Sequence, residues 1–245
     1  MSQSILDQLS IRSSEDAFLD QLIDGIEKYG APKIIANAPR AFIDLNRSTD
    51  ELDPALISGI KNNIRNPRIS SGLGVIPRVV SHGKEIYRGK LSFEQAQSRI
   101  KNYWKPYHTD LSNLLQRSQS VFGQSLLIDI HSMPHEAVST QSSFIKAPEI
   151  VVGDRFGMSS DPEFTSLVIS ILKQYNFQFD FRNKHKLHRP VFQCSFAVFH
   201  YFYFFFFWQQ VSLCCFFPSQ ALANFNFLFF SCCAFAMLRL REQSY

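Results

Sequence analysis

Apolar residues over the first 175 positions form two patterns: short runs, which favour buried strands, and stripes at helical spacing, which favour amphipathic helices. Gly, Pro, Asn and Ser separate these segments, as is typical of turns and loops. Expected strands cover 33–36, 41–45, 74–80, 85–89, 125–130 and 149–153, the third and fourth forming a hairpin. Expected helices cover 13–30, 92–104, about 108–121 and 162–175.

Capping residues support three of these helices. The segment 13–30 opens on serine and ends on glycine. Ser92 and Gln95 have capping-box spacing, and Asp161 followed by Pro162 is typical of a cap and a first helical residue. Short apolar strands alternating with amphipathic helices indicate an α/β protein with helices on both faces of its sheet.

The composition changes abruptly at Pro190. All five cysteines and 15 of the 25 phenylalanines follow it, and no Asp, Glu, Lys or Arg occurs from there to Leu238. We therefore expect an incomplete α/β domain over residues 1–189, followed by an aberrant Phe/Cys-rich apolar tail over residues 190–245 that is disordered or membrane-associated.

Three interpretations of this tail stay open. Its stretches 191–208 and 221–238 approach the length of a membrane span, although polar residues interrupt both. Translation of intron or frame-shifted sequence is favoured, because it explains the abrupt change of composition. An unusual core segment is the third interpretation.

Charge and the N-terminal sequence narrow the class of protein. The net charge is +4 and the one short basic patch, 182–189, is smaller than a nucleic-acid-binding surface requires, so no nucleic-acid partner is expected. The N-terminal segment carries acidic residues early and no apolar core, so we expect neither a secretory signal nor a basic transit peptide in it. Residues 1–189 lack cysteine, and we expect a cytoplasmic protein without a membrane partner unless the tail is a genuine anchor.

Polar groups follow three of the expected strands. They are Asp44-Leu45-Asn46-Arg47, Asp129-Ile130-His131-Ser132 and Gly153-Asp154-Arg155-Phe156-Gly157. Ligands of open α/β sheets bind at the carboxyl ends of the strands, so these groups are the candidate site.

His131 is the candidate metal ligand. An imidazole at a strand end suits zinc, and a carboxylate such as Asp129 commonly orients it or activates water. The alternative is a histidine hydrogen-bonded within a turn. His135 and Glu136 are two further candidate groups. The chain has no HExxH, CxxC, GxSxG or P-loop, so spacing alone establishes no metal, and the simplest serine-hydrolase and nucleotide readings are excluded.

Arg47 is the candidate anion-binding residue. Its guanidinium could hold a substrate carboxylate in two hydrogen bonds, and the alternative is a surface arginine paired with Asp50 or Glu51. Asp154 and Arg155 could likewise bind an anion or brace the site, or form an ion pair in a tight loop.

Longer sequence segments around these polar groups indicate a particular protein family. APRAFIDLNRSTDELDPALI, GLGVIPRVV, PYHTDL, LLIDIHSMPHEA and PEIVVGDRFG, in this order, resemble the N-formylglutamate amidohydrolase family over about residues 13–183. DLNR and DxHS are also similar to motifs of zinc carboxypeptidases and aspartoacylases. The resemblance implies an α/β fold of phosphorylase/hydrolase-like type, three-layer α/β/α with a mixed, mostly parallel sheet. It implies hydrolysis of N-formyl-L-glutamate, or a similar N-acyl amino acid as small-molecule substrate, to formate and the amino acid.

The resemblance also assigns roles. His131 is implied as a ligand of a divalent metal, zinc or alternatively cobalt, with Asp129 as its catalytic support. Asn46 and Arg47 are implied to hold a carboxylate of the substrate. Asp154 and Arg155 match a motif near the pocket, and we assign Asp154 to substrate binding and Arg155 to catalysis.

Two family features are not found in this sequence. Members carry a Pro-His-Ser-Gly-type segment, expected to bring the first metal ligands, and a Gln-x-Glu stretch whose Glu would be the general base. We therefore expect a chain that is incomplete at both ends and whose activity is in question. An inactive remnant that binds a small dicarboxylate and a membrane-associated interaction protein stay open as alternatives.

Overall fold

The computed structural model describes residues 4–60, 66–133, 150–154, 158–175, 179–181, 191–199 and 211–215. These residues fall into two compact units. The first unit holds residues 4–15, 36–60 and 66–110, and the second holds residues 16–35 together with the described residues from 111 onwards.

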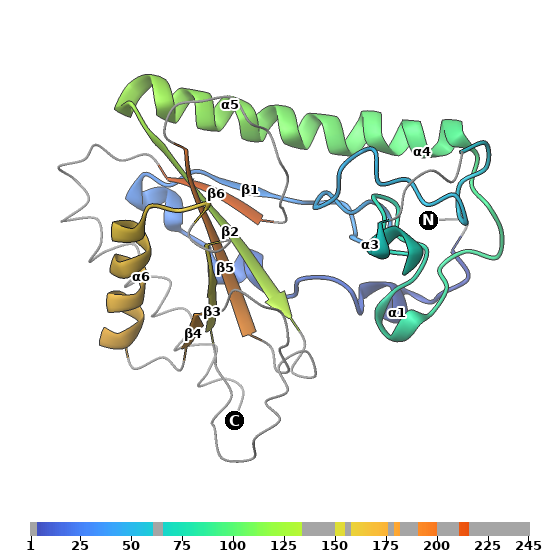
Figure 1. Ribbon diagram of the computed structural model, residues 1–245, viewed down its shortest axis with the longest axis horizontal. Coiled ribbons are helices and arrows are strands. Elements are labelled where there is room, and N and C mark those ends of the chain that lie inside the picture. The colour runs from blue at the N-terminus through green and yellow to red at the C-terminus, as the bar shows by residue number, and fades with distance from the viewer. Residues whose placement is uncertain are drawn as a thin grey trace, which may run out of the picture. The chain divides into compact units, whose positions relative to one another are not determined.

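The second unit contains a six-stranded mixed sheet (Figure 1). In spatial order its strands are β1 (Lys33–Ile35), β6 (Val211–Cys215), β2 (Ser125–Met133), β5 (Val191–Phe199), β3 (Ile150–Gly153) and β4 (Phe179–Phe181). Pairing is antiparallel for β1 with β6, β6 with β2 and β2 with β5, and parallel for β5 with β3 and β3 with β4. The expectation of a mixed sheet is met, but a mostly parallel one is wrong for these strands. The reason is that β5 and β6 both lie antiparallel to β2. The three-layer arrangement stays a prediction.

Strand β2 is largely buried. From Ser125 to His131 every residue except Leu126 is buried. Leu127 is buried on one face of the strand and Ile128 and Ile130 on the other, which is typical of a strand covered on both faces. The sequence-based strands over 125–130 and 149–153 are therefore confirmed as β2 and β3.

Helix α6 (Pro162–Gln174) follows β3 and has the predicted start. The Asp161 side chain accepts a hydrogen bond from the Glu163 amide at 2.8 Å, and Pro162 occupies the first turn. The helix buries Thr165, Val168, Ile171 and Leu172.

The expected helix over 13–30 is wrong. The segment instead holds two short helices, α2 (Leu19–Leu22) and the 3-10 helix η1 (Ile26–Tyr29), and is preceded by α1 (Gln8–Arg12). Phe18 and Gly25, with φ of 64° and 78°, adopt left-handed conformations that a right-handed helix excludes. The short strand expected at 33–36 is confirmed as β1.

The first unit is mostly turns and helices. Besides α1, its elements are α3 (Pro67–Ser70), the 3-10 helix η2 (Ser81–Gly83), α4 (Phe93–Arg99), the π-helical segment η3 (Ile100–Trp104) and the start of α5 (Lys105–Phe122). The Ser92–Gln95 capping box is confirmed.

Two strand predictions in the first unit fail. The segment 41–45 is a turn, because the amides of Phe42 and Ile43 both donate to the carbonyl of Pro39. The predicted hairpin keeps one antiparallel bridge, between Val79 and Glu85. The buried core of this unit includes Ile43, Leu56, Ile57, Ile76 and Ile86.

Over the described parts of the chain, every helix is too short or too polar to cross a bilayer. Residues 191–199, within the first apolar stretch of the tail, form strand β5. The division of the chain at residue 190 stays a prediction.

Candidate active site

Asp129 and His131 form a buried pair on β2. Residues two apart on a strand point to the same face, and His131 Nε2 lies 3.0 Å from Asp129 Oδ2. His131 is 8% exposed and Asp129 is 4% exposed. His131 lies within a strand and contacts a carboxylate of that strand, so the alternative of a turn histidine is wrong.

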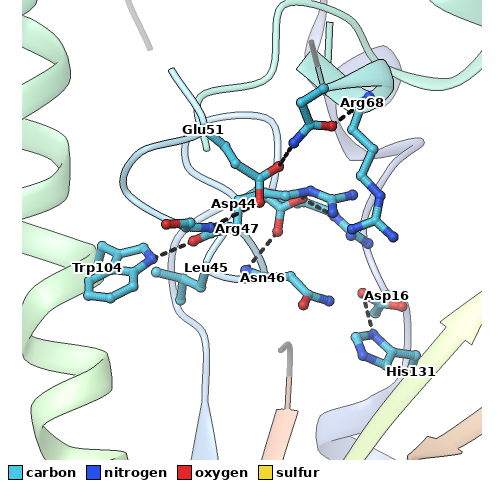
Figure 2. A network of polar contacts seen from close by, with 12 residues as sticks. Asp16, Asp44, Leu45, Asn46, Arg47, Glu51, Arg68, Trp104 and His131 are labelled. Carbon is cyan, nitrogen blue, oxygen red and sulfur yellow. Dashed lines mark hydrogen bonds and ion pairs between the residues drawn. The ribbon is translucent and has the colours of Figure 1, made fainter. Parts of the chain in front are cut away.

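Asp16 faces the other side of the imidazole (Figure 2). Its Oδ2 lies 3.6 Å from His131 Nδ1, and its Oδ1 accepts a hydrogen bond from the Ser132 amide at 3.0 Å. The Ser132 hydroxyl donates to the carbonyl of Ala17 at 3.1 Å, so β2 holds the segment that carries Asp16 at two points. His131 is therefore placed between two carboxylates.

These carboxylates determine the charge of the imidazole. Burial alone disfavours the imidazolium and lowers the pKa of His131, but the charges and hydrogen bonds of Asp129 and Asp16 outweigh burial and raise this pKa to about 10. At neutral pH both ring nitrogens thus carry protons, and Nε2–H donates to Asp129.

Asp16 and His131 also have the chemistry of metal ligands. Carboxylate oxygen and imidazole nitrogen are donors that zinc accepts, and a carboxylate on the far ring nitrogen, here Asp129, is the usual orienting partner. A metal between Asp16 and His131 would replace the Nδ1 proton. Within the described residues no group of three His, Cys, Asp or Glu side chains could hold a metal ion, so Asp16 and His131 would supply two ligands. His135 and Glu136 lie outside the described residues.

Asp154 directly follows β3 and is buried, at 6% exposure. Its carbonyl accepts a hydrogen bond from the Ser159 amide at 3.0 Å. Its buried Oδ1 accepts no hydrogen bond from the part of the chain that the structure describes. Arg155 lies outside the described residues.

The carboxyl ends of β2 and β3 do not lie at the same end of the sheet. β5 lies between them, antiparallel to β2 and parallel to β3, so the carboxyl ends of β2 and β3 point to opposite edges. The register nevertheless places Gly153 opposite Ser195, and Ser195 opposite Asp129. The expectation of a shared carboxyl edge for these two strands is therefore wrong, although both polar groups lie at one level of the sheet.

The first unit holds the Asp44–Arg47 turn, organised around the buried carboxylate of Asp44 (Figure 2). Asp44 Oδ1 accepts from the Asn46 amide at 2.8 Å, and Oδ2 accepts from Arg40 Nε at 3.1 Å. The Arg47 amide donates to the Asp44 carbonyl at 3.1 Å. Asn46 and Arg47 are therefore held together in one tight turn.

Arg47 is a largely buried cation. Its side chain is 13% exposed, and its Nε lies 3.7 Å from Asp44 Oδ2 and donates no hydrogen bond to the described residues. Burial lowers the pKa of Arg47 most, the nearby Arg68 and Arg40 lower it further, and Asp44 and Glu51 oppose the shift. The alternative of an exposed surface arginine is wrong, and a buried cation beside two others is suited to an anion.

Two aromatic residues contact the backbone of the same turn. Trp104 Nε1–H donates to the carbonyl of Arg47 at 2.8 Å (Figure 2). His108 Nε2 lies 3.3 Å from the carbonyl of Leu45. The sequence signals at Trp104, His108 and Asp16 are too weak for prediction, because each contact joins segments far apart in the chain.

The strands and helices define an α/β protein. The family model described as N-formylglutamate amidohydrolase matches residues 1–186, and the chain belongs to this family. The predicted family is thus confirmed.

Known relatives agree with this membership. The chain is 26% identical over 160 residues to N-formylglutamate deformylase of Pseudomonas aeruginosa, covering 64% of this chain and 54% of the relative. It is 30% identical over 149 residues to the protein of the same name from Pseudomonas putida, covering 60% of this chain and 50% of the relative. The chain thus spans about half the length of the curated relatives it matches.

A solved structure supports the fold. The N-formylglutamate amidohydrolase of Ralstonia eutropha JMP134 superimposes with a TM-score of 0.64 at 21% identity, covering 98% of this chain and 87% of that one. This likeness concerns the fold alone.

Proposed function

We propose that this protein hydrolyses N-formyl-L-glutamate, or a similar N-acyl amino acid, with a divalent metal held by Asp16 and His131. The observation that carries the proposal is the buried line of Asp129, His131 and Asp16, in a chain of the N-formylglutamate amidohydrolase family. The two bacterial deformylases support the choice of substrate by their names. A three-layer α/β/α arrangement of the sheet is part of the proposal.

The reaction breaks one amide bond. The oxygen of a water molecule bonds to the formyl carbon, the C–N bond breaks, and the amino nitrogen takes a proton, which gives formate and glutamate. A bound zinc or cobalt ion supplies electrophilic activation of the formyl carbonyl and of water. Asp129 contributes by fixing the orientation of the imidazole through Nε2, at 3.0 Å.

Arg47 and Asn46 bind a carboxylate of the substrate in this proposal. The Asp44 turn fixes both residues before binding, which reduces the ordering that binding requires. A guanidinium gives two parallel hydrogen bonds to a carboxylate. Asp154, whose buried Oδ1 accepts no hydrogen bond from the described residues, would accept one from a substrate N–H or from Arg155.

Formate release from N-formyl-L-glutamate tests the proposal on the full chain. After chelation of metals, added zinc or cobalt should give formate and glutamate in equal amounts. Arg47→Lys keeps the charge but loses the planar fork, so it should raise KM about tenfold or more, in line with a lost charge-assisted hydrogen bond. Lys90→Arg, at an exposed residue that bonds the Pro54 carbonyl, is the control and should leave KM unchanged. Formate release that persists after chelation, with neither metal added, would contradict metal dependence. The absence of formate with both metals would contradict hydrolysis.

A second candidate function is binding of a small dicarboxylate without turnover. It is favoured by the finding that, among the described residues, no three metal-ligating side chains lie together. Calorimetric titration with L-glutamate and glutarate distinguishes the two functions. Binding without formate release, with any metal, would favour the second, whereas turnover would exclude it.

A further inference from the structure

Within the Asp44–Arg47 turn, Asp44 accepts two hydrogen bonds from main-chain amides, whereas the carbonyls of Leu45 and Arg47 contact side chains outside the turn. The Asp44 side chain and carbonyl take the amides of Asn46 and Arg47. Two further carbonyls of the turn contact side chains outside it: that of Arg47 accepts from Trp104 Nε1–H at 2.8 Å, and that of Leu45 lies 3.3 Å from His108 Nε2. The turn that carries Arg47 is therefore attached to one helical segment at two carbonyls.

Trp104 and His108 reach these carbonyls as one stacked unit. They are four residues apart, so they lie on the same side of a helix. Their ring centroids are 3.8 Å apart with an interplanar angle of 29°. Each ring limits the rotation of the other, so the two nitrogens are held towards the turn.

The backbone beneath Trp104 is unusual in a way that Pro106 explains. Ile100–Trp104 is π-helical, and the Lys105 amide donates to the Ile100 carbonyl. Proline lacks the N–H that an α-helix requires and clashes with the carbonyl four residues earlier, here that of Asn102. A wider turn relieves this clash, and single π-helical turns are frequent at functional sites. The wider turn places Trp104 at the junction with α5, next to His108.

We propose that Trp104 and His108 are positioning residues for the anion-binding arm formed by Asn46 and Arg47. They fix the main chain of the turn, and thereby the starting point of the Arg47 side chain, before a carboxylate binds. The link to substrate rests on the proposed function, whereas the fixing of the turn does not.

Trp104→Phe tests the proposal, because it keeps an aromatic ring for stacking and removes the Nε1–H donor. The dissociation constant for L-glutamate, measured by calorimetry, should rise about fivefold to tenfold, as for one lost hydrogen bond. His108→Phe keeps the stack and removes the nitrogen, so it should act in the same direction and keeps the test open if the first variant does not fold. Tyr103→Phe, on the same π-helical segment, is the control; its ring packs against Phe42 and should leave the dissociation constant unchanged.

A double-mutant cycle with Arg47→Ala separates positioning from general destabilisation. If Trp104 acts through Arg47, Trp104→Phe should change the dissociation constant less than about twofold once Arg47 is absent. Independent, multiplicative effects of the two substitutions would overturn the proposal.

Hydrogen exchange gives a readout that needs no ligand. Amide exchange over residues 41–48 should be faster in Trp104→Phe than in the native chain or in Tyr103→Phe. Unchanged exchange in this segment would overturn the proposal. Faster exchange in a protein that neither binds L-glutamate nor releases formate would leave the positioning role standing and contradict the proposed function instead.

Discussion

At the scale of single residues, each of the two compact units contains a group of buried charges that compensate each other. His131 lies between Asp129 and Asp16, and Asp44 lies beside Arg40 and Arg47. A buried ion is costly unless an opposite charge and hydrogen bonds accompany it. Both arrangements meet this condition. In the proposed function a metal replaces the Nδ1 proton of His131, and Arg47 binds an anion.

The raised pKa of His131 makes stability depend on pH. The unfolded imidazole titrates near 6.5 and the folded one near 10, so folding binds a proton between these values. The stabilisation from the imidazolium is complete below pH 6.5 and is lost as pH rises towards and through 10. In the metal-free protein, the free energy of unfolding should therefore fall over this interval.

Urea unfolding at several pH values measures this effect. His131→Asn should remove the part of the pH dependence that comes from the imidazole, so the native chain and the variant should converge at high pH. Parallel curves for the two proteins between pH 6.5 and 10 would show that His131 does not titrate in this way.

At the scale of elements, the sequence predicts segments with strong local signals. β2 follows from an apolar run, and α6 follows from the Asp161–Pro162 start. The helix expected over 13–30 fails because long-range contacts determine that segment: Asp16 bonds the Ser132 amide, and Phe18 takes a left-handed conformation. No local pattern contains this information.

The site shows the same limit. Asp129 and His131 are predictable because two residues on one strand share a face. Asp16 is not predictable, because its contact with β2 spans 116 residues. The π-helical segment has a readable signal in Pro106, but the contacts of Trp104 and His108 with the turn depend on tertiary packing.

A close backbone approach beside the Asp44–Arg47 turn gives an element-scale prediction. A Cβ at Gly74 would lie 2.4 Å from the carbonyl oxygen of Glu51, which also accepts from the Val75 amide. Gly74→Ala should therefore destabilise the protein by about 2 kcal/mol or more, because a backbone atom must shift.

Gly89→Ala is the matched control. Nothing lies within 4 Å of a Cβ there, so the free energy of unfolding should change by about 0.5 kcal/mol or less. Equal thermal unfolding of the two variants would contradict the close packing of Glu51 against Gly74.

At the scale of the whole molecule, family and fold class are predictable and sheet layout is not. Several sequence segments that resemble the family, taken in their order, identify the family that the comparison confirms over residues 1–186. The pairing of β2 with β5 and β6, both from residues after Pro190, could not be predicted. The apolar composition of that tail predicts burial, but it predicts neither which strand each segment pairs with nor whether the pairing is parallel or antiparallel.

The proposed function requires that Asp16 and His131 hold a divalent metal ion. Cobalt binding to the full chain, followed by visible absorption and calorimetry, tests it most directly. Asp16→Ala and His131→Ala should each abolish or greatly weaken cobalt binding, and Asp129→Asn should weaken it about tenfold or more, as for loss of an orienting carboxylate. Asp161→Asn, which retains a good cap for α6, should bind cobalt like the native chain. Native affinity for cobalt in Asp16→Ala or His131→Ala would contradict this requirement.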